Sequence, residues 1–377
     1  MRKTIFLISL FILLFNLKAN ANRSIYIDNF ETILGDITAE NTLLNYAQSN
    51  DIKTLLLYGL HIVNANHNLS NPASNQILAD FIDKAKTTYG VLYVGATAEN
   101  EEFFTNIINT YNNSRNNSSE KFDIYNLEFE YWINSATGPS GYYCTTYLTP
   151  NGLPCTTDGA FQFYISTLQT MSTLASNNSH PITTEAYVGW PTALEASTIG
   201  TNLDRVRIHA YVSDPNTAFN YSEDRLIDFA NGNPDINVSI IFSSEPIFMQ
   251  NWLISNSMTN AENIFTQDWI AESSNWSNNI NLEGFTYFAY THNTDVTLSS
   301  NSENIHEKTK IFPNPTQNTL YVLNINTVQN ISVYNNLGQL ILETKEEKIN
   351  IEKLIPGVYF FKFQTKKRME TIKIIKK

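Results

Sequence analysis

Cysteine, histidine and basic residues are all scarce in this chain of 377 residues, which has two Cys, six His, and 24 Lys and Arg against 36 Asp and Glu. A zinc module needs several Cys and His ligands that converge on the ion, and these numbers are too low for one. We therefore expect no metal site and no cofactor. Nucleic acid is not expected as a partner, because no basic patch offsets the acidic charge of the main body.

Long apolar runs are also missing, since no stretch reaches the roughly 18 residues of a membrane-spanning helix. The run at residues 5–15 follows two basic residues and precedes an Ala-Asn-Ala sequence at 19–21. This order is typical of a secretory signal peptide. We predict that residues 1–21 are cleaved and that the mature protein has no transmembrane segment. An uncleaved anchor is the alternative.

Charged residues make up only 16% of the chain, whereas the apolar share of 42% is enough to bury a core. Residues 22–302 hold 9 Lys and Arg and 29 Asp and Glu, while residues 303–377 hold 12 and 7. This change of sign indicates two bodies with different roles. The 20 Tyr, 22 Phe and 5 Trp, together with the low charge, suggest an extracellular protein that binds polar, uncharged ligands.

Eight runs of apolar, β-branched and aromatic residues alternate with segments of helical spacing across residues 22–293. Such alternation implies right-handed βαβ units and a parallel sheet. We predict an α/β fold of the (β/α)8 TIM-barrel type. A doubly wound open sheet is the alternative, although no glycine-rich phosphate loop follows the first run. The eight runs are residues 24–30, 54–63, 89–97, 122–132, 183–190, 205–212, 238–243 and 284–290.

The fourth run, residues 122–132, alternates between polar and apolar positions. Asn126, Glu128 and Glu130 share one face, which enters the barrel if helices cover the other face. Two neighbouring carboxyl groups in a barrel mouth resist ionising together, so one pKa is expected to rise, as a general acid requires. The alternative is an edge strand with a solvated polar face.

The sequence from Asp123 to Glu130 resembles the strand-four signature of glycoside hydrolase family 18, Asp-x-x-Asp-x-Asp-x-Glu. Asp123 matches the first Asp and Glu130 the catalytic acid, while Asn126 and Glu128 replace the other two Asp residues. Tyr211 matches the Tyr of the strand-six motif. The resemblance implies a hydrolase of N-acetylglucosamine-containing glycans, of chitin or N-glycan core type, in which the acetamido group of the substrate is the nucleophile.

The same resemblance implies a role for each of these residues. Glu130 donates the proton, Glu128 with Asn126 orients the acetamido group, and Tyr211 hydrogen-bonds it. Because Asn126 and Glu128 depart from the signature, a catalytically inactive barrel that binds glycans is the alternative function. A surface protein with a barrel scaffold and no sugar site is a third possibility.

Several aromatic residues near strand ends are candidates for stacking on sugar rings. We predict that Trp132, Trp190, Phe288 and Tyr290 bind substrate, with Phe288 standing where family 18 has Trp. Packing in the core is the alternative for each of them.

The only two cysteines, Cys144 and Cys155, lie in an insertion at residues 133–158 that follows the fourth run. Because export favours oxidation, we predict that they form a disulfide, which stabilises by about 3 kcal/mol in the chain-entropy model. Two free thiols are the alternative. The Gly, Pro and Tyr content of the insertion suits the wall of a binding cleft.

The C-terminal part begins with an Asn- and Ser-rich segment at 294–308, which we predict to be a linker. Residues 309–377 then show short strand patterns separated by turns, as in a small all-β sandwich. This segment resembles the type A C-terminal sorting domain of the type IX secretion system. The matching motifs are Phe-Pro-Asn-Pro at 312–315, Val-Tyr-x-x-x-Gly-Gln at 333–339, Pro-Gly-Val-Tyr at 356–359 and the basic tail.

The resemblance to sorting domains implies that the type IX machinery is a partner of this chain. It also implies passage through the periplasm to the surface or exterior of a Gram-negative bacterium. A generic adhesive β-module is the alternative for residues 309–377.

Overall fold

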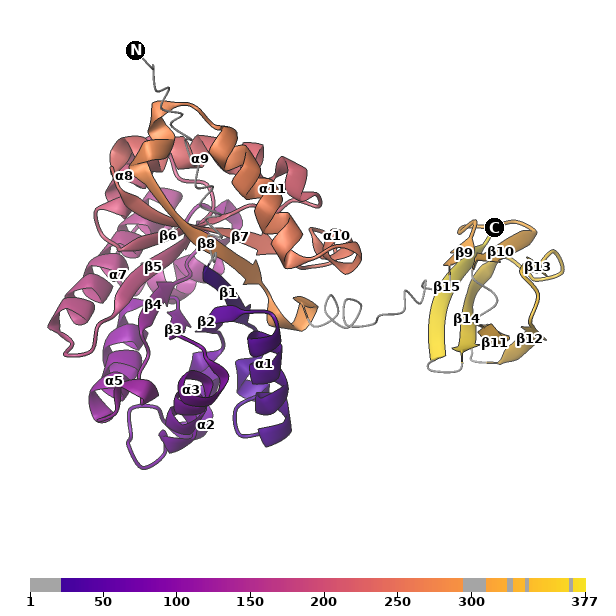
Figure 1. The fold of residues 1–377 in the computed structure, drawn as a ribbon, viewed down its shortest axis with the longest axis horizontal. Helices are drawn as coiled ribbons and strands as arrows, with labels where there is room; N and C mark the ends of the chain where they lie inside the picture. Colours follow the sequence, from indigo (N-terminus) through magenta and orange to yellow (C-terminus); the bar gives the residue numbers. More distant parts are fainter. Residues whose placement is uncertain (1–21, 294–309, 324–327, 336–338, 366–368) are drawn as a thin grey trace, which may run out of the picture. The chain divides into compact units, whose positions relative to one another are not determined.

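The computed structural model describes residues 22–293 and 310–377, apart from 324–327, 336–338 and 366–368 (Figure 1). The predicted signal peptide, residues 1–21, and the predicted linker, residues 294–308, lie outside the described residues. The chain divides into two compact units, Met1–Asn301 and Ser302–Lys377. Each unit is described by itself.

The first unit is built on a closed barrel of eight parallel strands in sequential order, which confirms the predicted TIM-type fold (Figure 1). Each strand pairs with its neighbours along the chain, and β1 closes the ring by pairing with β8. The strands are β1 (Asn22–Ile27), β2 (Ile52–Leu57), β3 (Tyr93–Ala98), β4 (Ile124–Leu127), β5 (Thr183–Val188), β6 (Arg205–His209), β7 (Ile236–Ser243) and β8 (Ile280–Phe288).

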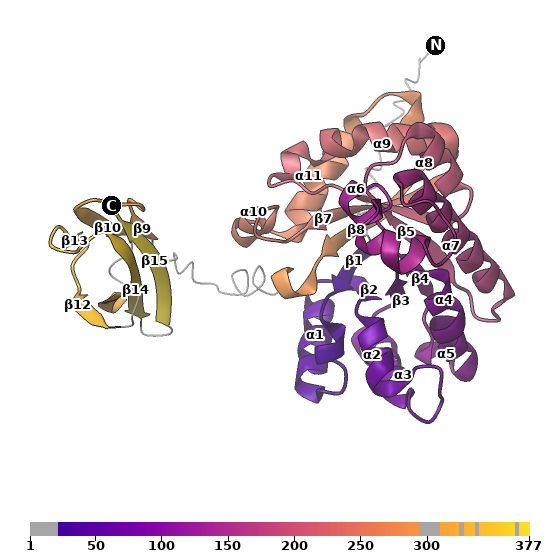
Figure 2. The ribbon, with the colours of Figure 1, turned by 180° about the vertical axis from the view of Figure 1, so that it is seen from behind.

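Helices surround the barrel in both ribbon views (Figures 1 and 2). Polar residues define where several of them begin: Asp36 accepts hydrogen bonds from the first turn of α1, and Thr192 with Glu195 forms a capping box at α8. The helices are α1 (Ile37–Ser49), α2 (Leu60–His67), α3 (Gln76–Tyr89), α4 (Glu101–Phe103), α5 (Asn109–Ser114), α6 (Asn134–Thr137), α7 (Thr157–Asn177), α8 (Ala193–Gly200), α9 (Ala218–Gly232), α10 (Gln250–Ser255) and α11 (Met258–Ala271). Shorter helical turns are η1 (Phe30–Thr32), η2 (Phe104–Ile108), η3 (Ser118–Glu120), η4 (Cys144–Leu148), η5 (Pro215–Thr217) and η6 (Asn275–Asn279).

The fourth strand is shorter than its sequence pattern suggested, since β4 ends at Leu127 rather than Trp132. The Glu128 amide still donates to the Ala98 carbonyl of β3, at 3.0 Å. The Tyr131 amide then donates a hydrogen bond to the Phe129 carbonyl at 3.0 Å, so the chain turns and leaves the sheet. Residues after Glu128 therefore belong to a loop at the carboxyl end of the barrel.

The main core lies between the strands and the helices, where outward-facing residues such as Tyr125, Leu127 and Phe129 are buried. A smaller apolar cluster fills the barrel interior and includes Tyr26, Leu56, Ile124, Tyr187 and Ile241. The alternation predicted for strand four therefore holds as far as the strand extends, with apolar side chains facing the helices.

A buried ion pair also lies inside the barrel. Glu185 and Arg207, exposed by 0% and 1%, pair at 2.6 Å between Oε1 and Nε. Arg205 also pairs with Glu185 at 2.6 Å, and Asn126 donates to it at 2.8 Å. Each charge of the pair has a partner and further hydrogen bonds. Removing one of the charged partners would therefore leave a buried charge uncompensated.

The second unit consists of two antiparallel sheets, in the orders β13-β10-β9 and β12-β11-β14-β15. Residues from both sheets form one core, including Leu320 and Ile349 from the first and Ile331, Val333 and Phe361 from the second. This arrangement confirms the predicted small all-β fold. Its strands are β9 (Lys310–Phe312), β10 (Thr319–Leu323), β11 (Val328–Asn335), β12 (Leu340–Thr344), β13 (Lys348–Asn350), β14 (Gly357–Thr365) and β15 (Met369–Lys376).

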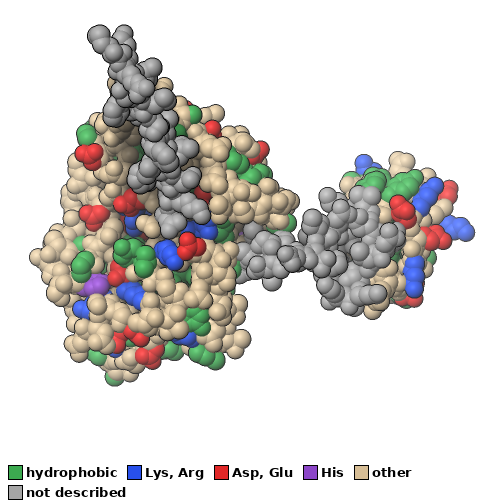
Figure 3. All heavy atoms as spheres, viewed as in Figure 1, with side chains coloured by type: hydrophobic (Ala, Val, Ile, Leu, Met, Phe, Trp, Pro, Cys, Tyr) green, Lys and Arg blue, Asp and Glu red, His purple; other side chains and the backbone are tan. Residues whose placement is uncertain are grey.

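Among the residues described, none of the helices has the length and apolar character needed to cross a membrane. On the face drawn in Figure 3, Lys and Arg side chains of the barrel unit are interspersed with Asp and Glu rather than gathered in one basic patch.

Candidate active site

The carboxyl ends of the barrel strands bring together Glu128 and Glu130, which follow β4. Active sites of this fold are built from the loops at this end. The Glu130 amide donates to the Tyr143 hydroxyl of the insertion at 3.2 Å. The two carboxyl groups therefore sit between the barrel interior and the insertion that follows β4.

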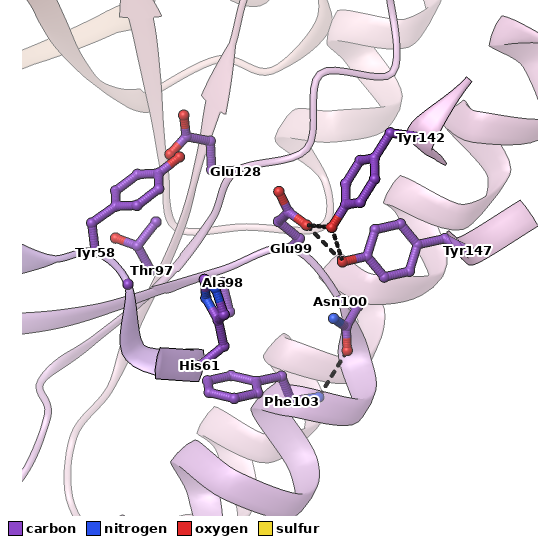
Figure 4. Close-up of a pocket in the computed structure, with 11 residues that line it drawn as sticks. Tyr58, His61, Thr97, Ala98, Glu99, Asn100, Phe103, Glu128, Tyr142 and Tyr147 are labelled. Atoms are coloured by element: carbon purple, nitrogen blue, oxygen red, sulfur yellow. Dashed lines mark hydrogen bonds between the residues drawn. The ribbon is translucent and has the colours of Figure 1, made fainter. Parts of the chain in front are cut away.

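Glu128 is the more strongly perturbed of the two carboxyl groups. Its Oε2 atom is buried and has no hydrogen-bond partner among the described residues. Burial raises the pKa of Glu128 to about 8; the nearby Tyr58 hydroxyl opposes the rise, and the charges of Glu130 and Glu99 add to it. Figure 4 shows the Tyr58 hydroxyl directed at this carboxyl group. Glu128 is thus largely protonated at neutral pH.

A pocket of about 250 Å³ opens beside Glu128 (Figure 4). Glu99, which follows β3, accepts hydrogen bonds there from Tyr147 at 2.6 Å and from Tyr142 at 3.1 Å. Both tyrosines come from the insertion. The lining residues are Tyr58, Gly59, His61, Thr97, Ala98, Glu99, Asn100, Phe103, Glu128, Tyr142 and Tyr147.

The predicted disulfide is confirmed: Cys144 and Cys155 are bonded, with their Cα atoms 5.0 Å apart. The loop that they close carries Tyr147, and Tyr142 lies just before it. The insertion therefore forms one wall of the pocket, as its composition suggested, and the disulfide restrains that wall.

Glu130 lies on the side of the barrel mouth formed by the neighbouring strand β5. Burial raises the pKa of Glu130, and the nearby Tyr187 hydroxyl of β5 opposes the rise. The Tyr187 hydroxyl also lies 2.9 Å from Nδ1 of His209 on β6. The Trp132 ring lies 5.4 Å from the Tyr187 ring. Both Glu130 and Trp132 therefore lie at the mouth beside Tyr187.

The other two signature positions of strand four lie below the mouth. Asn126 is fully buried, donates to Glu185 and accepts a hydrogen bond from Tyr26 at 3.3 Å. Asp123 precedes β4 and pairs with Lys86 at 2.7 Å and with His180 at 2.9 Å. It thus lies at the amino end of the strand, apart from Glu128 and Glu130.

The predicted aromatic residues divide into a group at the barrel mouth and one residue in the core. Tyr211 stacks on His209 with centroids 4.9 Å apart and lies 6.4 Å from Phe288, so both rings belong to the mouth. Trp190, which follows β5, is 52% exposed and available for stacking on a ligand.

The structure does not place Tyr290 at the mouth. It is 8% exposed and packs at 5.4 Å against Tyr46 of α1. The sequence interpretation assumed that strand eight continues to this residue, but β8 ends at Phe288, and the chain then turns towards the outer layer. Its observed position is that of a core residue.

Sequence reasoning missed Tyr58, Glu99, Tyr187 and His209, all close to strand ends. They could have been found by the pattern that identified the strand-four residues, namely polar side chains at the carboxyl ends of parallel strands. No group of three or more His, Cys, Asp or Glu residues that could hold a metal ion occurs in the part of the chain that the structure describes.

Comparison with known proteins does not identify a family for the barrel. No curated protein matches the chain. A β-glucuronidase of Bacteroides uniformis aligns with a TM-score of 0.38 and 8% identity, covering 95% of this chain and 46% of that one. A calcium-binding mutant of β-glucuronidase 2 of the same organism gives 0.41 and 8%, covering 94% and 45%. The chain spans less than half the length of these enzymes.

The C-terminal unit, in contrast, has a specific match. Residues 310–377 match a family model described as a secretion system C-terminal sorting domain, Por_Secre_tail. The match confirms the predicted sorting domain and indicates that the type IX machinery handles this chain for delivery to the cell surface or beyond. Residues 310–377 are therefore a secretion system sorting domain.

Proposed function

We propose that the barrel is a secreted glycoside hydrolase domain whose acid catalyst is Glu130. One observation carries the proposal: two carboxyl groups with raised pKa values, Glu128 and Glu130, lie together at the mouth of a TIM-type barrel. A raised pKa favours the protonated form of a carboxyl group, and cleavage of a glycosidic bond requires such an acid. Trp190 and Tyr211 supply flat rings beside this pair.

The proposed substrate is a glycan that contains N-acetylglucosamine. Protonated Glu130 would donate its proton to the glycosidic oxygen while the acetamido oxygen attacks the anomeric carbon and displaces the leaving sugar. Water would then open the cyclic intermediate after losing a proton to Glu130, which restores the acid. Glu128 would orient the acetamido group, and Tyr211 would donate a hydrogen bond to it.

A barrel that binds glycans without cleaving them is the second candidate. Asn126 favours it, because its amide is engaged by Glu185 and Tyr26 and supplies no carboxylate to the site. The two candidates share the aromatic mouth and differ in the chemistry at Glu130.

The test compares wild type with Glu130→Gln on chitooligosaccharides and N-glycan cores. Removing the acid while keeping its shape should lower hydrolysis at least about 100-fold and leave glycan binding intact. Glu102→Gln, at an exposed carboxylate on α4, serves as the control and should change neither. Binding without turnover in wild type would favour the second candidate, and neither binding nor turnover would refute both.

A further inference from the structure

Arg225 of α9 carries a buried charge that the proposed reaction does not use. The residue is 4% exposed, and no ion pair among the described residues includes it. Its guanidinium instead donates to two backbone carbonyl groups, those of Gly189 at 3.1 Å and Tyr221 at 2.8 Å. Burial lowers the pKa of Arg225 to about 10, so the group is still charged at neutral pH. Because a buried charge without a counter-charge costs stability, its presence here points to a role in the site.

The guanidinium of Arg225 covers one face of the Trp190 ring. It lies 4.5 Å from the centroid of that ring, which is a cation–π contact. The rings of His209 and Tyr221 meet the Trp190 ring at steep angles, 77° and 71°, with centroids 5.2 Å and 5.5 Å away. Trp190 is nevertheless 52% exposed. With one face covered and half of the residue exposed, the opposite face is the one open to a ligand.

The backbone that carries Trp190 is fixed from two sides. Gly189, whose carbonyl accepts from Arg225, lies so close to Trp132 that an added Cβ would be 2.4 Å from the Trp132 ring. Trp132 therefore packs directly on the Gly189 backbone while Arg225 holds its carbonyl group. The Trp190 ring is thus ordered before a ligand arrives, which lowers the entropy cost of stacking on it.

Arg225 is the charged group in contact with the Trp190 ring among the described residues. Burial, and then the charge of Arg225, lower the pKa of His209 to about 3, so the neighbouring imidazole is uncharged at neutral pH. A cation on one face of a ring draws its π electrons towards itself and repels a second cation on the other face. The open face of Trp190 therefore suits an uncharged sugar ring better than a protonated amine.

We propose that Arg225 is a positioning and specificity-determining residue, which holds Trp190 as a stacking surface for an uncharged sugar and disfavours a protonated amino sugar there. The inference rests on the proposed function for the identity of the ligand. N-acetylglucosamine is uncharged, whereas its deacetylated counterpart, glucosamine, carries an ammonium group. The effect of the charge on the ring itself does not depend on that function.

The first experiment needs no glycan. The fluorescence of Trp190 in the mature protein, obtained as the difference between wild type and Trp190→Phe, is quenched with iodide, with caesium and with neutral acrylamide. Trp190 is the one exposed residue among the five Trp, so its signal should respond strongly to quenchers. Acrylamide reports the exposure of the ring, and the ratio of iodide to caesium quenching reports the charge beside it.

Three variants separate the charge from the packing. Arg225→Met removes the charge and should lower the ratio of iodide to caesium quenching about twofold. Arg225→Lys keeps the charge and should keep the ratio. Lys53→Met, which removes a positive charge beside Asp51 at the start of β2, is the matched control and should also leave the ratio unchanged. An unchanged ratio in Arg225→Met, or an equal fall in Arg225→Lys, would overturn the proposal.

The second experiment measures specificity by calorimetry at mildly acidic pH, where the amine is protonated. It compares N-acetylglucosamine and glucosamine oligomers of equal length, in a Glu130→Gln background that prevents hydrolysis. Arg225→Met should narrow the preference for the acetylated oligomer about fivefold, while Arg225→Lys keeps it. An unchanged preference in Arg225→Met would overturn the proposal. If neither oligomer binds to wild type, the proposed function and the sugar ligand are refuted, and the quenching ratio still decides whether Arg225 acts on Trp190.

Discussion

Replacing Glu128 with Gln should stabilise the barrel at neutral pH, even though Glu128 belongs to the proposed site. Gln keeps the shape of the side chain and removes its ionisation. In the folded protein, burial raises the pKa of Glu128 from 4.5 to about 8, whereas the unfolded chain ionises near the ordinary value. The folded state therefore holds a proton that the unfolded state has already released over this range of pH.

Folding stability should fall as pH rises wherever the folded state binds more protons than the unfolded state. For Glu128 the fall is about 1.4 kcal/mol per pH unit between roughly pH 4.5 and 8, or about 5 kcal/mol in all. Below pH 4.5 both states are protonated and the penalty vanishes. Relative to wild type, Glu128→Gln should gain about 3 kcal/mol between pH 4.5 and pH 7.

Urea unfolding at several pH values, followed by tryptophan fluorescence, measures this difference. All five Trp residues lie between positions 132 and 276, so the signal reports the barrel and not the sorting domain. We expect the stability difference between the variant and wild type to widen from pH 4.5 to 8 and then to level off. Parallel stability curves across this range would refute the raised pKa and, with it, the reasoning that makes this pair a catalytic site.

Three further predictions concern other parts of the chain. Glu185→Gln should cost about 3–5 kcal/mol of unfolding free energy, because it leaves the buried Arg207 without its counter-charge; unchanged thermal unfolding would contradict this. Trp190→Ala should weaken glycan affinity about tenfold in calorimetry, whereas Tyr290→Ala should cost about 3 kcal/mol of stability and leave affinity unchanged, and equal losses of affinity would disprove the assignment of the two rings. Deletion of residues 310–377 should leave the barrel in the periplasm of the native host, and normal secretion of the shortened chain would refute the role of the sorting domain.

The barrel and the inward face of its fourth strand could be predicted from sequence because both depend on local periodicity. Strand-like and helical runs alternate along the chain, and the two-residue period of a strand places Asn126 and Glu128 on one face. The same period explains Asp123, which is an odd number of residues from Asn126 and so points away from the barrel interior. The family signature had grouped it with the catalytic residues.

The rest of the site depends on register between strands that are far apart in sequence. The contact between Tyr187 and His209 forms because β5 and β6 pair with Val188 opposite Ile208, which brings the two side chains within hydrogen-bonding distance. Parallel strands are joined by long crossover segments, and no local turn fixes how one is offset against the next. Sequence patterns therefore predicted the strands but not these contacts between them.

The central claim is acid-assisted hydrolysis at the barrel mouth with the substrate's acetamido group as nucleophile. Its most direct test is the anomeric configuration of the first product, read by proton NMR during the early hydrolysis of β-linked chitooligosaccharides. Attack by the acetamido oxygen and then by water inverts the anomeric carbon twice, so the account predicts that the β-anomer forms first. Initial release of the α-anomer, or no hydrolysis of glycans that contain N-acetylglucosamine, would contradict it.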